Sequence, residues 1–137
     1  MAVNTERTRP AAAAIAILIG ALAVPAHAAQ VACHLTYGGE TRTVEAGPTT
    51  DPYAVRAVPF GSYFLFRIVF RDRPADLAGI KLTVFADRDE GATPIHQATH
   101  AYPTRAAAVH GFTGLNFVYE PVRDGELQYW CEIRGKR

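Results

Sequence analysis

Histidine is the first residue type in this sequence that could bind a metal ion, and four histidines follow the N-terminal segment. His96 and His100 form an H-x3-H pair, a spacing that on a helix places both rings on one face. The flanking residues predict a strand instead, along which four residues span about 13 Å. A metal ion holds its ligands at about 2 Å. The pair therefore shares a metal only if that strand is wrong or if each ring is joined by a different neighbour.

We interpret the histidines as surface or loop residues and expect no cofactor. A periplasmic metal-binding protein, for copper or zinc, is the alternative function. Copper is disfavoured because residues 29–137 contain no methionine. The residues that would serve such a site are His34, His96, His100 and His110.

Cys33 and Cys131 are the two cysteines of the chain, and both lie in runs of alternating apolar residues. In residues 126–134 (ELQYWCEIR), the cysteine shares one face with a leucine, a tyrosine and an isoleucine, as expected for a half-buried strand. Residues 30–37 repeat this pattern. We therefore predict that both strands face one core and are joined by a disulfide. Such a bridge would exclude a thiol nucleophile.

Residues for hydrolytic chemistry are sparse. Ser62 is the single serine, and its surroundings do not form a nucleophile elbow. The carboxylate pairs Asp72 with Asp76 and Glu120 with Glu126 flank predicted turns, and they could act together only if the fold brought them close. We therefore predict that the protein is not an enzyme, and a small secreted hydrolase is the third function considered.

The N-terminus predicts export. Arg7 and Arg9 precede an apolar run, residues 11–24, whose 14 positions fall short of the roughly 20 that a spanning helix needs. Pro25 and the sequence Ala26-His27-Ala28 complete the plan of a secretory signal peptide, residues 1–28, cleaved near Ala28. The predicted location is periplasmic or secreted, with no membrane span in the mature chain. An uncleaved anchor, or lipidation at Cys33, are the alternatives, and lipidation would leave Cys131 without a partner.

Residues 29–137 have the size of one domain. Once Arg7, Arg9 and Glu6 are removed from the 14 basic and 13 acidic residues of the chain, twelve of each sign are left. This balance argues against a nucleic-acid partner, which requires a strong positive bias.

Short apolar runs separated by glycine and proline predict an all-β fold, a small antiparallel β-sandwich of about seven to eight strands with one disulfide. We expect loops at residues 46–52 and 87–94, and a short helical turn at residues 106–108. The strongest strand, 63–71, directs its phenylalanines inward. The expected strands are 30–37, 40–45, 53–60, 63–71, 80–86, 95–102, 115–120 and 126–134.

The final strand resembles the sixth strand of an immunoglobulin domain, in which an acidic turn precedes Tyr-x-Cys. Asp124, Tyr129 and Cys131 occupy comparable places over about ten residues. The chain departs from that family because its cysteines are farther apart, no seventh strand follows and no tryptophan lies earlier. The resemblance implies at most an immunoglobulin-like sandwich.

Large apolar residues opposite the predicted core could form an exposed patch if several lie on the same sheet. If they do not, loops or a second buried face would cover them. The predicted function is accordingly an exported, non-catalytic binding or interaction module of the bacterial cell envelope, whose partner is an envelope protein or a small ligand. The residues of this predicted surface are Leu65, Phe85, Val118 and Trp130.

Overall fold

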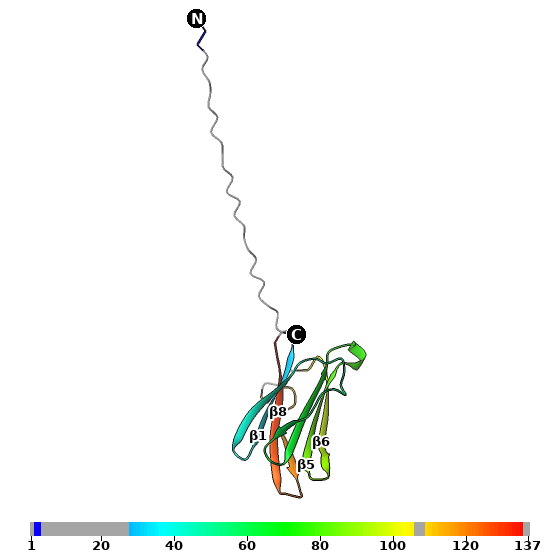
Figure 1. The fold of residues 1–137 in the computed structure, drawn as a ribbon. Coiled ribbons are helices and arrows are strands. Elements are labelled where there is room, and N and C mark those ends of the chain that lie inside the picture. The colour runs from blue at the N-terminus through cyan, green and yellow to red at the C-terminus, as the bar shows by residue number, and fades with distance from the viewer. Residues whose placement is uncertain (1, 4–27, 106–108, 136–137) are drawn as a thin grey trace.

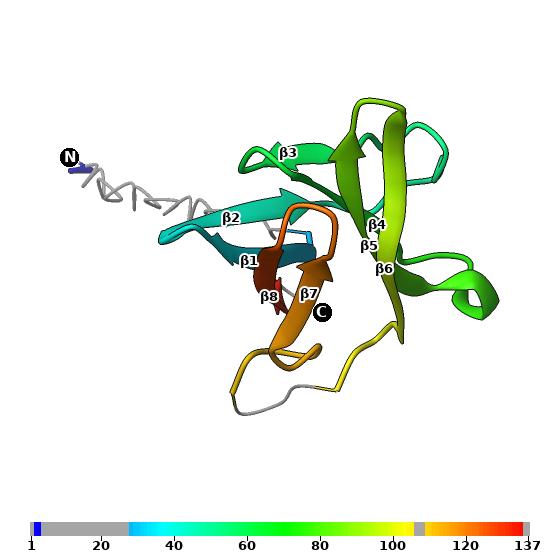
Figure 2. The same cartoon turned by 90° about the horizontal axis from the view of Figure 1, so that it is seen from below.

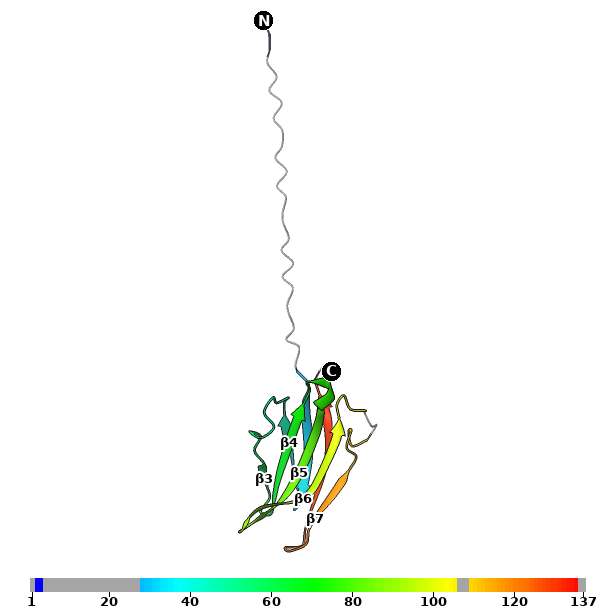
Figure 3. The ribbon, with the colours of Figure 1, turned by 90° about the vertical axis from the view of Figure 1, so that its right-hand side faces the viewer.

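Within the residues that the structure describes, eight strands form two antiparallel four-stranded sheets that face each other, which confirms the predicted β-sandwich (Figures 1 and 2). The first sheet has the order β2-β1-β8-β7 and the second the order β3-β4-β5-β6. Figure 3 shows the strands of the second sheet lying side by side. The elements are β1 (Gln30–Tyr37), β2 (Glu40–Ala46), β3 (Val58–Phe60), β4 (Phe64–Arg71), the 3-10 helix η1 (Ala75–Leu77), β5 (Gly79–Arg88), β6 (Gly91–Ala101), β7 (Asn116–Glu120) and β8 (Gly125–Arg134).

The structure is a computed structural model that describes residues 2–3, 28–105 and 109–135. The predicted signal peptide lies largely outside the described residues, as does the helical turn expected at residues 106–108. In the described part of the chain, no helix has the length and apolar character needed to cross a membrane.

The core lies between the inner faces of the two sheets. In β4, Phe64, Phe66 and Phe70 are fully buried, as their alternation predicts, and Leu127 and Tyr129 of β8 meet them from the other sheet. Burying a side chain of this size contributes about 1.5–3 kcal/mol. The apolar faces of β4 and β8 therefore help to hold the two sheets together, with the buried residues of β1 and β5 in the same core.

The predicted disulfide joins Cys33 of β1 to Cys131 of β8. The two residues are direct partners in the β1–β8 ladder, so the bridge connects neighbouring strands of one sheet. In immunoglobulin domains the corresponding bridge connects the two sheets. The last strand therefore resembles that family in sequence, but its disulfide joins a different pair of strands.

The loop predicted at residues 87–94 is wrong, because β5 and β6 continue into a turn at residues 89–90. Pro94 suggested a loop, since proline cannot donate a ladder hydrogen bond. β6 is an edge strand, and it carries an irregularity at this point: Phe85 pairs with Pro94 while Val84 pairs with His96. An edge position beside a bulge accommodates the proline.

The connection from β2 to β3 runs along the free edge of β4. The amide N–H of Thr49 donates to the carbonyl oxygen of Phe70 at 2.8 Å. Only the three residues of β3 pair with β4 beyond this point, so the strand expected at residues 53–60 is shorter than predicted. This path brings Pro52 and Tyr53 over the outer face of the second sheet.

Candidate anion-binding site

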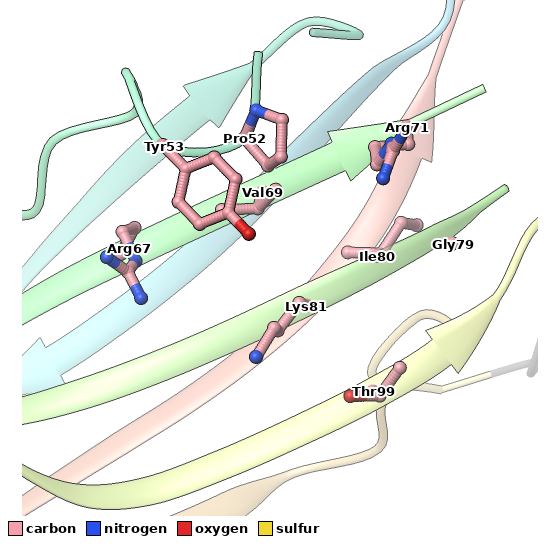
Figure 4. A pocket seen from close by; sticks show the side chains of 9 residues that line it. All are labelled: Pro52, Tyr53, Arg67, Val69, Arg71, Gly79, Ile80, Lys81 and Thr99. Carbon is pink, nitrogen blue, oxygen red and sulfur yellow. The ribbon is translucent and has the colours of Figure 1, made fainter. Parts of the chain in front are cut away.

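A pocket of about 340 Å³ lies on the outer face of the second sheet, beneath the β2–β3 connection (Figure 4). This volume lies within the range of small-molecule sites, which is about 300–1,000 Å³. Three strands and the connection contribute the residues that line the pocket. They are Pro52, Tyr53, Arg67, Val69, Arg71, Gly79, Ile80, Lys81 and Thr99.

Strand alternation explains why cations gather in this pocket. Arg67, Val69 and Arg71 occupy every second position of β4 and face away from the core that the phenylalanines fill. The ladder pairs Val69 with Lys81 of β5, and Lys81 in turn with Thr99 of β6. Lys81 therefore projects from the same face as the two arginines and from a position between them, as Figure 4 shows.

The cations of the pocket have no acidic partner among the residues that the structure describes. The Nε atoms of Arg67 and Arg71 are buried and make no hydrogen bond to the protein. The guanidinium of Arg67 lies over the ring of Phe85, 5.1 Å from its centroid. This ring is a weak substitute for a carboxylate, since a partly exposed cation–π contact contributes only about 0.5–1 kcal/mol.

Four other arginines of the described chain are ion-paired, namely Arg73, Arg88, Arg123 and Arg134. Arg88 lies 2.9 Å from Glu120, and Arg134 lies 2.8 Å from Glu45. An arginine with buried, unsatisfied donors is costly for a fold, because each lost hydrogen bond costs about 1–3 kcal/mol. In Arg67 and Arg71, which have no carboxylate partner in the described part of the chain, the Nε donor also remains without a partner from the domain.

The arrangement is suited to binding a negatively charged group. A guanidinium presents paired N–H donors that match the oxygens of a carboxylate or phosphate, and the lysine adds a point charge. The hydroxyls of Tyr53 and Thr99 add groups that can donate or accept. None of the nine lining residues, all of which are described, is an aspartate, glutamate, histidine, serine or cysteine. These side chains can hold an anion through charge and through hydrogen bonds.

The H-x3-H pair lies on a strand, as the sequence predicts, and both rings turn toward the first sheet. His96 Nε2 and the hydroxyl oxygen of Tyr129 are hydrogen-bonded at 2.7 Å, while the ring of His100 packs edge-on against Phe112. Burial lowers the pKa of both histidines, because a charged ring is poorly solvated there. The same effect raises the pKa of Tyr129 to about 12.

His34 lies on the outer face of the first sheet, stacked on Trp130 with ring centroids 4.0 Å apart. Its Nε2 lies 2.9 Å from a carboxylate oxygen of Glu132, and its Nδ1 lies 3.1 Å from the hydroxyl of Thr43. His110 contacts the other side of this cluster through the edge of Trp130. Among the described residues, no three histidine, cysteine, aspartate or glutamate side chains are grouped to hold a metal ion.

The predicted apolar surface is not one patch, and Val118 was wrongly assigned to it. Val118 is only 3 % exposed, because it pairs with Leu127 and turns with it into the core. Leu65 and Phe85 are paired on the second sheet, whereas Trp130 lies on the first. The outward positions of β7 are instead Phe117 and Tyr119, with 58 % and 54 % of their surface exposed.

Sequence reasoning missed the basic pocket, although inward phenylalanines in the strand expected at residues 63–71 imply that Arg67, Val69 and Arg71 face outward. The signal in the sequence was a pair of arginines, Arg67 and Arg71, on the same face of one strand with no carboxylate between them. Lys81 could not be added, because only the ladder register shows that it lies opposite Val69.

Comparisons of the chain with protein-family models, with curated proteins and with solved structures found no match. The molecule is thus defined by its own features as a disulfide-bonded antiparallel β-sandwich with a basic pocket on one outer face.

Proposed function

We propose that this protein is a non-catalytic binding module of the bacterial cell envelope, and that it holds an anionic ligand on the outer face of its second sheet. One observation carries this proposal: Arg67, Arg71 and Lys81 surround one pocket and have no carboxylate partner in the described part of the chain. The three like charges repel one another, and an anion would relieve that repulsion.

The envelope location is supported by the leader and by the disulfide. The basic start, the short apolar run and the Ala26-His27-Ala28 sequence have the order of a secretory signal. A bridge between Cys33 and Cys131 is typical of proteins that fold in an oxidising compartment. Fractionation of cells that express the full chain tests this part of the proposal, and the processed protein is expected outside the cytoplasm.

Titration of the purified protein with citrate and with inorganic phosphate, followed by calorimetry, tests the anion site. Binding that weakens steeply with added salt is expected, because charge attraction is screened. A double variant, Arg67→Gln with Arg71→Gln, should lose this binding. Arg73→Gln is the matched control, since Arg73 is 80 % exposed and lies outside the pocket. The proposal fails if neither anion binds, or if the double variant binds as well as the control.

A further inference from the structure

The basic pocket continues into a second hollow of about 460 Å³ on the same outer face. Tyr53 and Arg67 line both hollows, so the two meet at these residues. The second hollow extends along the β2–β3 connection toward Phe85. Its lining residues are Tyr53, Ala54, Val55, Arg56, Ala57, Arg67, Phe85 and Ala92.

The two hollows together carry four cations and no lining acidic residue. Arg56 adds a fourth positive charge at the far end, and it is exposed on the connection. Along β4, Arg67 and Arg71 are four residues apart, which corresponds to about 13 Å of strand. The charges are therefore spread over a length that exceeds one carboxylate or phosphate group. A ligand with several anionic groups in a row would satisfy more of them than a single anion.

A ligand on this surface meets side chains, because the backbone N–H and C=O groups of β4 and β5 lie in the plane of the sheet and do not point to its face. An acidic peptide could reach these cations only through its side chains, because a sheet face offers no free strand edge for backbone pairing. A chain of sugar rings needs no backbone ladder. Its hydroxyls can use side-chain partners such as Thr99, and a ring can stack on Tyr53, which is 97 % exposed.

A single-stranded nucleic acid would use successive aromatic rings as stacking platforms. Here the ring of Phe85 is already covered by the guanidinium of Arg67, which leaves Tyr53 as the exposed aromatic ring of the two hollows. We therefore propose that this groove binds an extended acidic oligosaccharide, with carboxylates on successive sugars facing Arg71, Lys81, Arg67 and Arg56. This inference depends on the proposed function and names the ligand class for the same site.

Calorimetric titrations with galacturonic acid and with its linear hexamer test the inference. The hexamer is expected to bind roughly a hundredfold more tightly than the monomer, because linked groups bind at a high effective concentration. A neutral hexasaccharide measures sugar contacts without charge, and hexaglutamate measures charge without sugar. Both are expected to bind more weakly than the acidic hexamer.

Two variants locate the far end of the groove. Arg56→Gln should lower the affinity for the hexamer about fivefold more than that for the monomer, as expected for one partly exposed charge pair. Arg73→Gln should change neither affinity. Circular dichroism checks that each variant is folded.

Two outcomes would overturn the inference alone, and a third would overturn the proposed function with it. If citrate binds through Arg67 and Arg71 but the hexamer binds no better than the monomer, the proposed anion site is supported and the proposed oligosaccharide groove is wrong. Equal or tighter binding of hexaglutamate shows a polyanion site without preference for sugars, and it overturns the glycan assignment. If neither citrate, phosphate nor any uronate binds, both proposals fall.

Discussion

Val69 of β4 and Lys81 of β5 are direct partners in the ladder of the second sheet. Because side chains alternate along β4, this pairing places the ammonium of Lys81 between Arg67 and Arg71 on one face. A shift of the register by one residue would turn Lys81 toward the core and dismantle the pocket. The register of two strands therefore creates the basic site.

Reversal of the charge of Lys81 should abolish anion binding without lowering the stability of the fold. Lys81→Glu places a carboxylate beside the two guanidinium groups, so citrate and phosphate binding should be lost. The new ion pairs are partly exposed, and the free energy of unfolding should rise by about 0–1 kcal/mol. Calorimetric titration and thermal unfolding measure the two effects. Lys81→Gln is the control that removes the charge alone, and wild-type affinity in Lys81→Glu would show that the anion binds elsewhere.

Glu120 is a buried carboxylate that should control acid stability. Its side chain is fully buried and lies 2.9 Å from Arg88 and 3.2 Å from Arg123. The hydrogen bond from Arg88 is the main reason that the pKa of Glu120 falls from 4.5 to about 2, opposed by burial. Because the pKa is lower in the folded protein, ionised Glu120 stabilises the fold above pH 4.5. This contribution decreases as the pH falls from there toward 2.

Glu120→Gln should therefore lower the urea midpoint at neutral pH, and the difference from the wild type should shrink as the pH approaches 2. The physical reason is that a neutral amide leaves the guanidinium charges uncompensated. Glu126→Gln, an exposed position on the adjacent strand, is the matched control and should change little. A constant difference at every pH would contradict the assignment.

The hydrogen bond between His96 of β6 and Tyr129 of β8 should stabilise the contact between the two sheets. Tyr129→Phe removes the hydroxyl from a fully buried position and should cost about 1–2 kcal/mol of unfolding free energy. Tyr119→Phe removes an exposed hydroxyl that bonds to Asp124 and should cost less. Chemical denaturation measures both, and equal costs would contradict the role of the buried bond.

Burial of His96 should also make the stability of the fold depend on pH. Its pKa lies below 6.5 in the folded protein, so the unfolded chain takes up a proton first when the pH falls. Stability conferred by the neutral ring is present above pH 6.5 and declines as the pH drops through that value toward the lowered pKa. Titration of the ring by NMR should give a pKa below 6.5. A value above it would contradict the buried environment.

Removal of the disulfide should cost up to about 4–5 kcal/mol, because the bridge closes a long loop in the unfolded chain. Cys33 and Cys131 are 98 residues apart, and the described residues include no free cysteine. The variant Cys33→Ala with Cys131→Ala should unfold at lower denaturant than the oxidised protein. A thiol reagent should find no reactive group in the native protein and two after reduction and unfolding. A reactive thiol before reduction would contradict the bridge.

Titration with copper and zinc tests the alternative function, which is metal binding by the histidines. The ring nitrogens of His34 are both hydrogen-bonded, and His96 is bonded to Tyr129. A metal would have to break these contacts, so tight one-to-one binding is not expected. Tight binding that is lost in His96→Gln or His34→Gln would make the metal function the better assignment.

Sequence reasoning predicted the parts of the fold that follow from local alternation. The inward phenylalanines of β4 and the core face of β8 are visible in the chain, because side chains on a strand point to opposite faces in turn. It was wrong at Pro94, where an edge position and a bulge tolerate a proline that a central strand would not. It was also wrong at Val118, because a short run gives two equally good phases for the alternation.

The sequence by itself determined the alternating faces of the clearest strands and the pairing of the two cysteines, and it predicts the leader, since each depends on neighbouring residues or on residue counts. Only the tertiary structure decided that Cys33 and Cys131 are cross-strand partners, and that Lys81 lies between Arg67 and Arg71. Strand order and register depend on packing between segments far apart in the chain, so no local pattern contains them. For the same reason, cations that look scattered in the sequence share one pocket in the folded protein.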